Sequence, residues 1–206
     1  MSKLNTRERI MEAALSMFSE RGYEGSSTRD IAERAGVNEI TLFRHFGNKE
    51  NLFREVLSRQ GATSLLTEEL DERLSGCLRE DLTFLAQRYL EVQYKNIDYI
   101  RIGVMEAPRN PAFANVIHVI PERLEAHLAE YMAKLAAQHV IRNRNFKLLA
   151  RMFYGQLFHH VLMMCSFGDD VISLQNESSE MVDTLVSMFV QTLTIDDEKG
   201  MRSCTV

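Results

Sequence analysis

The sequence predicts an all-helical protein, in which a small N-terminal three-helix unit precedes a larger helical domain. Apolar residues recur at intervals of three and four along most of the chain, which is the spacing of one helix face, and no stretch alternates as a half-buried strand does. Residue types that cap helices, and glycines that end them, separate these patterns. Two short helical patterns are joined by only four residues, Ala35-Gly36-Val37-Asn38, which is the length of a turn.

The composition is that of a chain that folds around a buried core. The chain has 206 residues, of which 45% are hydrophobic. No apolar run nears the roughly 18 residues that span a bilayer, and the start is too polar for a secretory signal, so we expect a cytoplasmic protein without a membrane partner. Residues 1–60 hold ten Lys/Arg against nine Asp/Glu, and the remainder holds 14 against 20, so the net charge of -5 arises behind the N-terminal unit.

The first helix is expected at 6–21. Asn5 and Glu8 have the residue types and spacing of a capping pair, and Gly22 is placed to end the helix. Its apolar stripe would cover the two short helices that follow, since those alone bury too little. A fourth helix, expected from 48 toward 74, would be the joint between the two domains.

The two short helices form a predicted helix-turn-helix. Ser27 and Asn38 are N-cap residue types, and Gly36 can take the positive φ that a sharp helix end needs. Ala32 is small where the two helices cross, and Leu42 is placed to fill the gap between them. Helices joined by so short a turn are a recurring unit of DNA-binding proteins.

The outward positions of the second short helix suit a DNA groove. They supply hydrogen-bond donors, a methyl-bearing side chain and cations. These residues are Glu39, Ile40, Thr41, Arg44 and His45, and Lys49 follows at the start of the next helix.

At these residues the chain resembles the TetR family of transcriptional regulators. The matching stretches are TRERIMEAALSMF, GYEGSSTRDIAERAGV and TLFRHFGNKENLF, within the first sixty residues. A later segment, RIGVMEAPRNPAF, is similar to a stretch of the AefR-like branch of that family. The resemblance implies an N-terminal DNA-binding domain, a helical ligand-binding and dimerisation domain behind it, and repression that a small molecule relieves.

The candidate DNA-binding residues combine the outward positions with those that the resemblance implies. They are Ser27, Thr28, Arg29, Asn38, Glu39, Ile40, Thr41, Phe43, Arg44, His45 and Lys49. The first three stand at a helix start, where backbone N–H groups favour a phosphate; the alternative is a plain cap beside a solvated arginine.

Four residues of the reading helix have more specific interpretations. Arg44 is the candidate for reading guanine, with a phosphate contact as the alternative. Thr41 suits a thymine methyl or a phosphate, and Glu39 suits either a cytosine amine or the helix dipole. Phe43 stands where the family usually has tyrosine, so a hydroxyl contact to phosphate is in doubt there.

The domain bounds and remaining helices follow from the same patterns. We expect the helix-turn-helix domain at 1–50, the ligand-binding and dimerisation domain at 51–195, and a disordered tail at 196–206. Further helices are expected at 79–96, 98–107, 112–138 with a break before Pro121 as an alternative, 145–167 and 175–194.

The last two helices are apolar over more than one stripe. One face can meet the chain's own core and another a second copy, as in an isologous four-helix contact, and the family resemblance implies the same homodimer. The candidate interface residues are Phe153, Leu157, Met181, Leu185, Met188 and Phe189.

An effector site has weaker support. Eleven Met and eleven Phe would allow an adaptable apolar cavity, although ordinary core is the alternative for each residue. The candidates are Phe84, Arg88, Tyr89, Met105, Phe113, Tyr154, Phe158 and Met163.

No pattern indicates catalysis, a metal or a cofactor. His159 and His160 are adjacent, and neighbours on a helix point about 100° apart, so they cannot chelate one ion together. The chain also lacks a G-x-S-x-G elbow and a glycine-rich phosphate loop.

The sequence therefore predicts a homodimeric repressor that leaves a palindromic operator when a small, largely apolar effector binds. The alternative is a helical ligand-binding or protein-interaction protein whose DNA binding has degenerated. Phe43 and the nearly neutral N-terminal unit are the reasons to keep that alternative.

Overall fold

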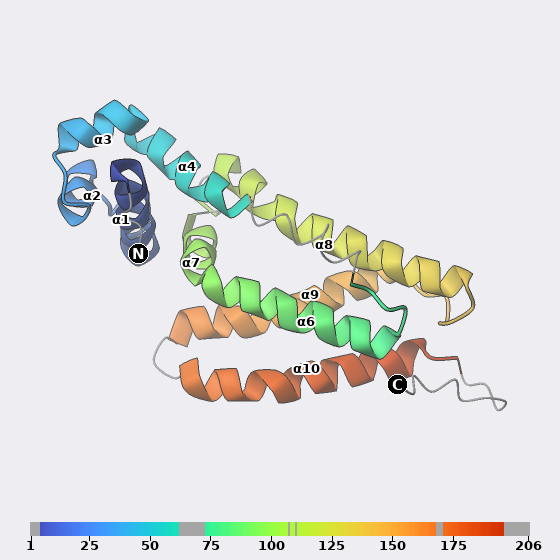
Figure 1. Ribbon diagram of the computed structural model, residues 1–206. Helices are drawn as coiled ribbons and strands as arrows, with labels where there is room; N and C mark the ends of the chain where they lie inside the picture. The colour runs from blue at the N-terminus through green and yellow to red at the C-terminus, as the bar shows by residue number, and fades with distance from the viewer. Residues whose placement is uncertain (1–4, 62–72, 107, 110, 168–170, 196–206) are drawn as a thin grey trace. The chain divides into compact units, whose positions relative to one another are not determined.

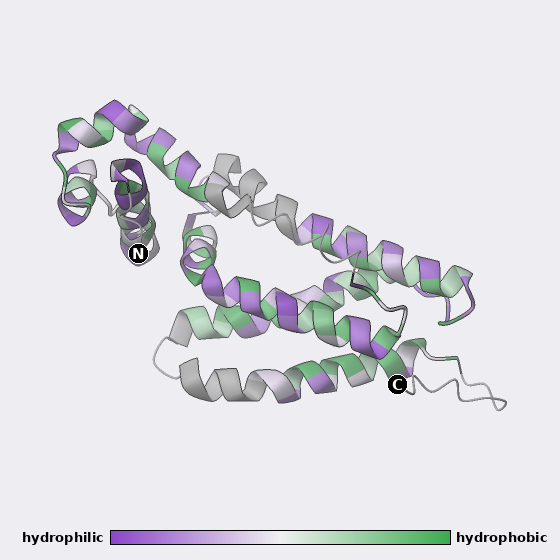
Figure 2. Cartoon of the chain, in the orientation of Figure 1, coloured by the Kyte–Doolittle hydropathy of each residue, from purple (hydrophilic) through white to green (hydrophobic). Residues whose placement is uncertain are grey.

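A computed structural model describes residues 5–61, 73–106, 108–109, 111–167 and 171–195, and every regular element in them is a helix (Figure 1). The all-α prediction is therefore confirmed. Hydrophobic and hydrophilic residues alternate in short groups along these helices, as expected for amphipathic helices (Figure 2). The helices are α1 Thr6–Arg21, α2 Thr28–Arg34, α3 Glu39–Phe46, α4 Lys49–Gly61, α6 Leu78–Lys95, α7 Ile97–Glu106, α8 Pro111–Ala137, α9 Phe146–Phe167 and α10 Val171–Leu193.

The chain divides into two compact units. The first comprises residues 1–64 and 96–120, and the second comprises residues 65–95 and 121–206. The N-terminal helices therefore share their unit with a segment far along the sequence, which contains α7.

The first unit is built around α1. This helix has the predicted capping box, in which Asn5 and Glu8 each bond the other's backbone N–H, and it ends at Gly22 with φ +71°. Its buried face packs against α2, α4 and α7. The Phe18 ring meets the Phe53 ring edge-on at 4.8 Å between centroids, within a core that α7 enters through Ile102.

The helix-turn-helix has the local features that its sequence predicts. The Ser27 side chain accepts the N–H of Asp30, and the Asn38 side chain accepts the N–H of Ile40 at 2.9 Å. Gly36 takes φ +65°, a conformation that glycine adopts without steric cost. Ala32 and Leu42 are both buried in the same core.

The second unit contains α6, α9 and α10 in mutual contact. The Phe153 ring of α9 meets the Phe189 ring of α10 edge-on at 5.3 Å. A buried carboxylate, Asp81, holds the segment before α6: it accepts the backbone N–H groups of Ser75 and Gly76, both at 2.8 Å, and the hydroxyl of Tyr131.

α8 has nearly the predicted bounds of 112–138, and it runs through Pro121, so the alternative break before that proline is not found. One helix start differs from the predicted one. α10 begins at Val171, four residues before the predicted start. The predicted continuation of the fourth helix to 74 and the predicted tail at 196–206 lie largely outside the described residues. In the part of the chain described, no helix is both long and apolar enough to span a membrane.

Candidate nucleic-acid interface

Of the five predicted outward residues of α3, Ile40 and Arg44 are exposed, whereas Glu39, Thr41 and His45 are partly buried. Leu42 and Phe46 are buried in the core of the first unit, which fixes the rotation of the helix about its axis. On the opposite side Ile40 is 75% exposed and Phe43 is 42% exposed, and Arg44 lies exposed beside them. The helix therefore presents a mixed apolar and cationic face.

The starts of the two short helices are joined by a bond that the sequence did not reveal. The hydroxyl of Thr28, at the start of α2, donates to Glu39 Oε1, at the start of α3, over 2.6 Å. Thr28 and Glu39 were predicted to make separate DNA contacts. The bond depends on the crossing of the helices, so no local pattern announces it, and it holds the Glu39 carboxylate toward α2.

The cations near α3 fall into two groups. In the described residues no ion pair engages Arg29 or Arg44, both of which are exposed. The Lys49 ammonium instead lies 4.2 Å from the centroid of the Tyr23 ring, a cation–π contact. His45 is partly buried, with its ring 6.2 Å from that of Phe46.

Other arginines of the same unit are engaged by carboxylates. Arg34 and Ser16 both donate to Glu20, and the Arg34 hydrogen bond is the main cause that lowers the pKa of Glu20 to about 2. Among the described residues of this unit the ion pairs are Arg7–Glu55, Arg34–Glu20, Arg54–Glu50 and Arg101–Asp98. The carboxylates of Glu55, Glu20, Glu50 and Asp98 are thus paired with arginines other than Arg29 and Arg44.

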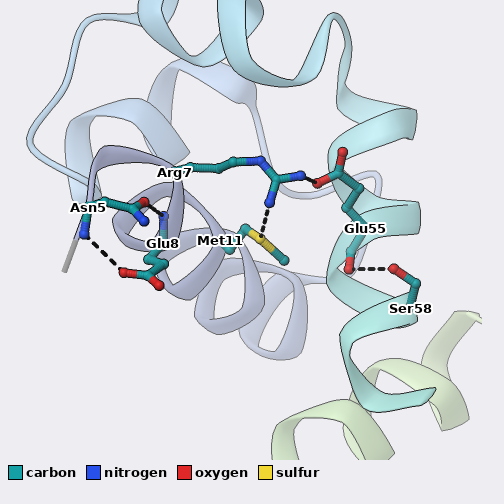
Figure 3. Close-up of a pocket in the computed structure, with 6 residues that line it drawn as sticks. All are labelled: Asn5, Arg7, Glu8, Met11, Glu55 and Ser58. Atoms are coloured by element: carbon teal, nitrogen blue, oxygen red, sulfur yellow. Dashed lines mark hydrogen bonds and ion pairs between the residues drawn. The ribbon is translucent and has the colours of Figure 1, made fainter. Parts of the chain in front are cut away.

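A shallow hollow of about 380 Å³ lies between α1 and α4 (Figure 3). Its side chains bond mainly to one another: Arg7 contacts Glu55 and the sulfur of Met11, and Asn5 and Glu8 form the capping box. None of the predicted effector residues lines it. The hollow lies over the joint between the two helices, where the Arg7–Glu55 ion pair connects α1 and α4.

The predicted effector residues are divided between the two units. Met105 and Phe113 belong to the first unit and the other six to the second. Of the six, Tyr89 and Tyr154 come together, with ring centroids 5.2 Å apart. Burial raises the pKa of both phenols above its ordinary value. Arg88 bonds Glu91 at 2.9 Å on the helix surface, and Phe158 is exposed.

The predicted dimer residues also fall into two groups. Phe153, Leu157, Leu185 and Phe189 are buried within the chain's own second unit. Met181 is partly buried, whereas Met188 is 60% exposed. The residues proposed for a partner are therefore mainly core, and the exposed apolar positions lie next to them on the same helices.

Two polar features with long-range partners were missed. Glu106, buried on α7, accepts the backbone N–H of Tyr23 at 2.8 Å. In the second unit His160 Nε2 lies 3.1 Å from the Tyr94 hydroxyl and 3.0 Å from the Ser178 hydroxyl. The residue types did not predict these contacts, because each contact joins segments whose packing the sequence pattern does not specify.

Comparisons with known proteins place the chain in a family. Residues 10–56 match the family described as bacterial regulatory proteins, tetR family, and residues 80–192 match the AefR-like transcriptional repressor, C-terminal domain. The HTH-type transcriptional regulator YvkB of Bacillus subtilis (strain 168) is 29% identical over 193 residues, which are 93% of this chain and 98% of that protein.

Solved structures agree in fold. A TetR-family transcriptional regulator from Mesorhizobium loti MAFF303099 superposes with a TM-score of 0.72 at 26% identity, over 92% of this chain and 97% of that one. FadR of Bacillus subtilis, solved in complex with stearoyl-CoA, gives a TM-score of 0.68 at 21% identity, over 87% and 97% of the two chains. This chain therefore belongs to the TetR family of bacterial regulatory proteins, which are DNA-binding transcriptional regulators and not enzymes.

Proposed function

We propose that the protein is a homodimeric repressor that binds a near-palindromic operator and leaves it when a small, largely apolar effector binds. The outward face of α3 is the observation that carries this proposal. Ile40, Phe43 and Arg44 stand exposed on the helix that a helix-turn-helix places in the major groove. This exposure favours a working regulator over the alternative of degenerate DNA binding, in which nothing requires these side chains to face solvent.

The charges near α3 suit a phosphate backbone. Affinity for DNA depends on the number of phosphate contacts and not on total charge, so a net charge of -5 is no obstacle. Arg29 at the start of α2 and Arg44 on α3 are exposed, and in the described residues no carboxylate pairs with them. Two copies would double the number of such contacts.

Selection from random duplex DNA with the full chain tests the operator. We expect an inverted repeat whose half-sites are about 34 to 36 Å apart. Arg44→Ala should lose discrimination at one base pair per half-site, whereas Arg29→Ala should weaken binding to all sequences and reduce the salt dependence. Equal losses on the selected and random DNA would show that Arg44 does not read a base. Enrichment of no sequence would contradict the operator itself.

The dimer is proposed to form through the exposed faces of α9 and α10. Met152 on α9 and Met188 on α10 are 52% and 60% exposed, and Leu148 and Phe158 are also exposed on α9. Apolar side chains left at the surface of two neighbouring helices suit an isologous contact with a second copy. The buried candidates, such as Phe153, would support this face from within the protomer.

Sedimentation equilibrium of the full chain tests the dimer. A charge at the centre of the proposed face, as in Met152→Glu or Met188→Glu, should shift the protein toward monomer because it would be buried without a partner. Ala133→Glu, on the exposed side of α8, is the matched control and should leave the dimer unchanged. A dimer that survives both methionine changes would place the interface elsewhere.

The effector is proposed to bind in the second unit beside Tyr89 and Tyr154. Their buried, protonated phenols offer hydrogen bonds within a mainly apolar environment, which is the usual character of a small-molecule site. α6, which carries Tyr89, is followed after one residue by α7 of the DNA-reading unit. An effector that favours one arrangement of the dimer would weaken operator binding by a coupling of about 1 to 3 kcal/mol.

FadR, a protein of the same fold solved with stearoyl-CoA, suggests the first probe. Operator binding should weaken when stearoyl-CoA or free stearate is added. CoA alone is the control, because it lacks the acyl chain. Tyr154→Phe should alter that response without altering operator affinity in the absence of probe. A response that is identical in Tyr154→Phe and the natural protein would move the site away from this pair.

A further inference from the structure

The outward face of α3 carries two exposed apolar side chains, Ile40 and Phe43. Ile40 has the largest exposed fraction among the large hydrophobic side chains of the described residues, and Phe43 follows one turn later on the same side. The helix cannot rotate to cover them, because Leu42 and Phe46 on its inner side fill the core of the first unit. In the protomer Ile40 is 75% exposed and Phe43 is 42% exposed, so both keep apolar surface open to solvent.

A side-chain cap fixes the first turn of α3, in which Ile40 is exposed. The Asn38 side chain accepts the Ile40 N–H and fixes the start of the helix, the part of a reading helix that contacts base edges. The neighbouring Glu39 carboxylate is bonded to Thr28 on α2. A carboxylate that would otherwise dominate the contact is thus drawn to one side.

The surroundings of the apolar pair indicate an anionic partner. Arg44 lies beside Phe43 on the exposed side of α3, and Arg29 lies exposed at the start of α2. In the part of the chain described, neither arginine has a carboxylate in an ion pair. An apolar strip edged by cations fits a polyanion with apolar groups in its groove and not a purely apolar protein surface.

The major groove of DNA offers one apolar group among the four standard bases, the 5-methyl group of thymine. We propose that Ile40 and Phe43 read thymine 5-methyl groups, so that each half-site of the operator contains at least one thymine defined by its methyl alone. This inference rests on the proposed operator binding and adds the chemistry of the specificity. Burial of one methyl group by Ile40 corresponds to about a fourfold gain in affinity.

Deoxyuridine tests the proposal, because it differs from thymidine only by that methyl group. An operator duplex obtained by selection is remade with uracil at one thymine position at a time, and the dissociation constant of the full chain is measured by fluorescence anisotropy. We expect one or two positions per half-site to weaken binding about fourfold each. Thymines in the flanking sequence should change it by less than about twofold.

The Ile40→Ala variant assigns the effect to its side chain. It should bind the natural operator more weakly, lose the difference between thymine and uracil at one position, and keep its affinity for random DNA. Val104→Ala, which truncates another exposed side chain of the same unit, should behave as the natural protein. Since Ile40 is exposed, the variant should fold, and circular dichroism checks this.

Three results would overturn the inference, and they are distinguishable. If an operator is selected but uracil is tolerated at every position, methyl reading is wrong and operator binding stands. If a uracil effect persists unchanged in both Ile40→Ala and Phe43→Ala, other residues read the methyl group. Failure to select any operator would remove the proposed function and this inference with it.

Discussion

The carboxylate of Glu106 accepts a 2.8 Å hydrogen bond from the backbone N–H of Tyr23, a residue 83 positions earlier in the chain. Glu106 ends α7, and Tyr23 lies just after α1, so the bond fastens α7 to the segment that leads into the helix-turn-helix. It lies at the edge of a core that α7 shares through Ile102. The position of the reading helices therefore depends on a residue outside the N-terminal sequence.

Replacing Glu106 should destabilise the first unit. Glu106→Ala removes the acceptor of a part-buried N–H and should lower the free energy of unfolding by about 1 to 3 kcal/mol. Glu106→Gln keeps a carbonyl oxygen at the same reach and should lose less. Urea unfolding measures both, with the exposed Glu122→Ala as the control. An equal loss in the two variants would mean that the charge, and not the acceptor, matters.

Two glycines should respond in opposite directions to alanine. Gly22 has φ +71°, and a Cβ there would lie 2.8 Å from Glu106 Oε1, so Gly22→Ala should cost about 1 to 3 kcal/mol. Gly155 lies within α9, and a Cβ there meets nothing within 4 Å, so Gly155→Ala should gain about 0.5 to 1 kcal/mol. Unfolding at low protein concentration compares them.

Gly155 also reports on the proposed dimer. It lies one turn from Met152 on α9, and a glycine lets two helices approach closely. If a second copy packs there, Gly155→Ala should raise the dimer dissociation constant while it stabilises the isolated chain. A variant whose dimerisation is unchanged would place Gly155 outside the contact.

The buried Asp81 should matter more than its partner Tyr131. Asp81→Ala leaves the N–H groups of Ser75 and Gly76 and the Tyr131 hydroxyl without their acceptor, and should cost about 3 kcal/mol or more. Tyr131→Phe removes one donor and should cost about 1 to 2 kcal/mol. Burial, with the adjacent Asp81, raises the pKa of Tyr131, so this bond persists at alkaline pH. Denaturant unfolding of the two variants provides the comparison, and a larger loss for Tyr131→Phe would contradict it.

Glu20 should link stability to acidity. Its pKa is lowered to about 2, from an ordinary value of 4.5, chiefly by the hydrogen bond from Arg34. A lowered carboxylate pKa gives a stabilising contribution that is complete above pH 4.5 and disappears as the pH falls toward 2. An NMR titration of the Glu20 carboxyl should show this midpoint, and Arg34→Ala should raise it. Arg54→Ala, which removes a different ion pair, should not.

Local chemistry explains which features the sequence predicts well. The caps at Asn5, Ser27 and Asn38 and the turn at Gly36 depend on residues at most three positions apart, and all have the expected geometry. The family match also rests on such short-range spacing. The helical fold and the exposure of Ile40 and Arg44 on α3 were therefore predictable, whereas the partial burial of Glu39, Thr41 and His45 was not.

Contacts between distant helices explain what was missed. The Thr28–Glu39 bond, the Glu106–Tyr23 bond and the approach of His160 to Tyr94 each join two elements whose crossing the sequence pattern does not specify. The buried face of α9 could not be predicted for the same reason. Phe153 and Met152 are both apolar, and only the packing of the helices decides that Phe153 is buried and Met152 is exposed.

Because Ile102 of α7 belongs to the core around α1 and Glu106 of α7 bonds Tyr23, the DNA-reading module is discontinuous in sequence. In a chimera that joins only residues 1–61 to another regulator, the helix packed against α1 would be that of the other regulator and not α7 of this chain. Such hybrids should respond to a new inducer only when the recipient supplies an isoleucine-like side chain and a carboxylate at the matching places. An exchange of operator preference between relatives would then depend on two α7 residues that pack inside this unit.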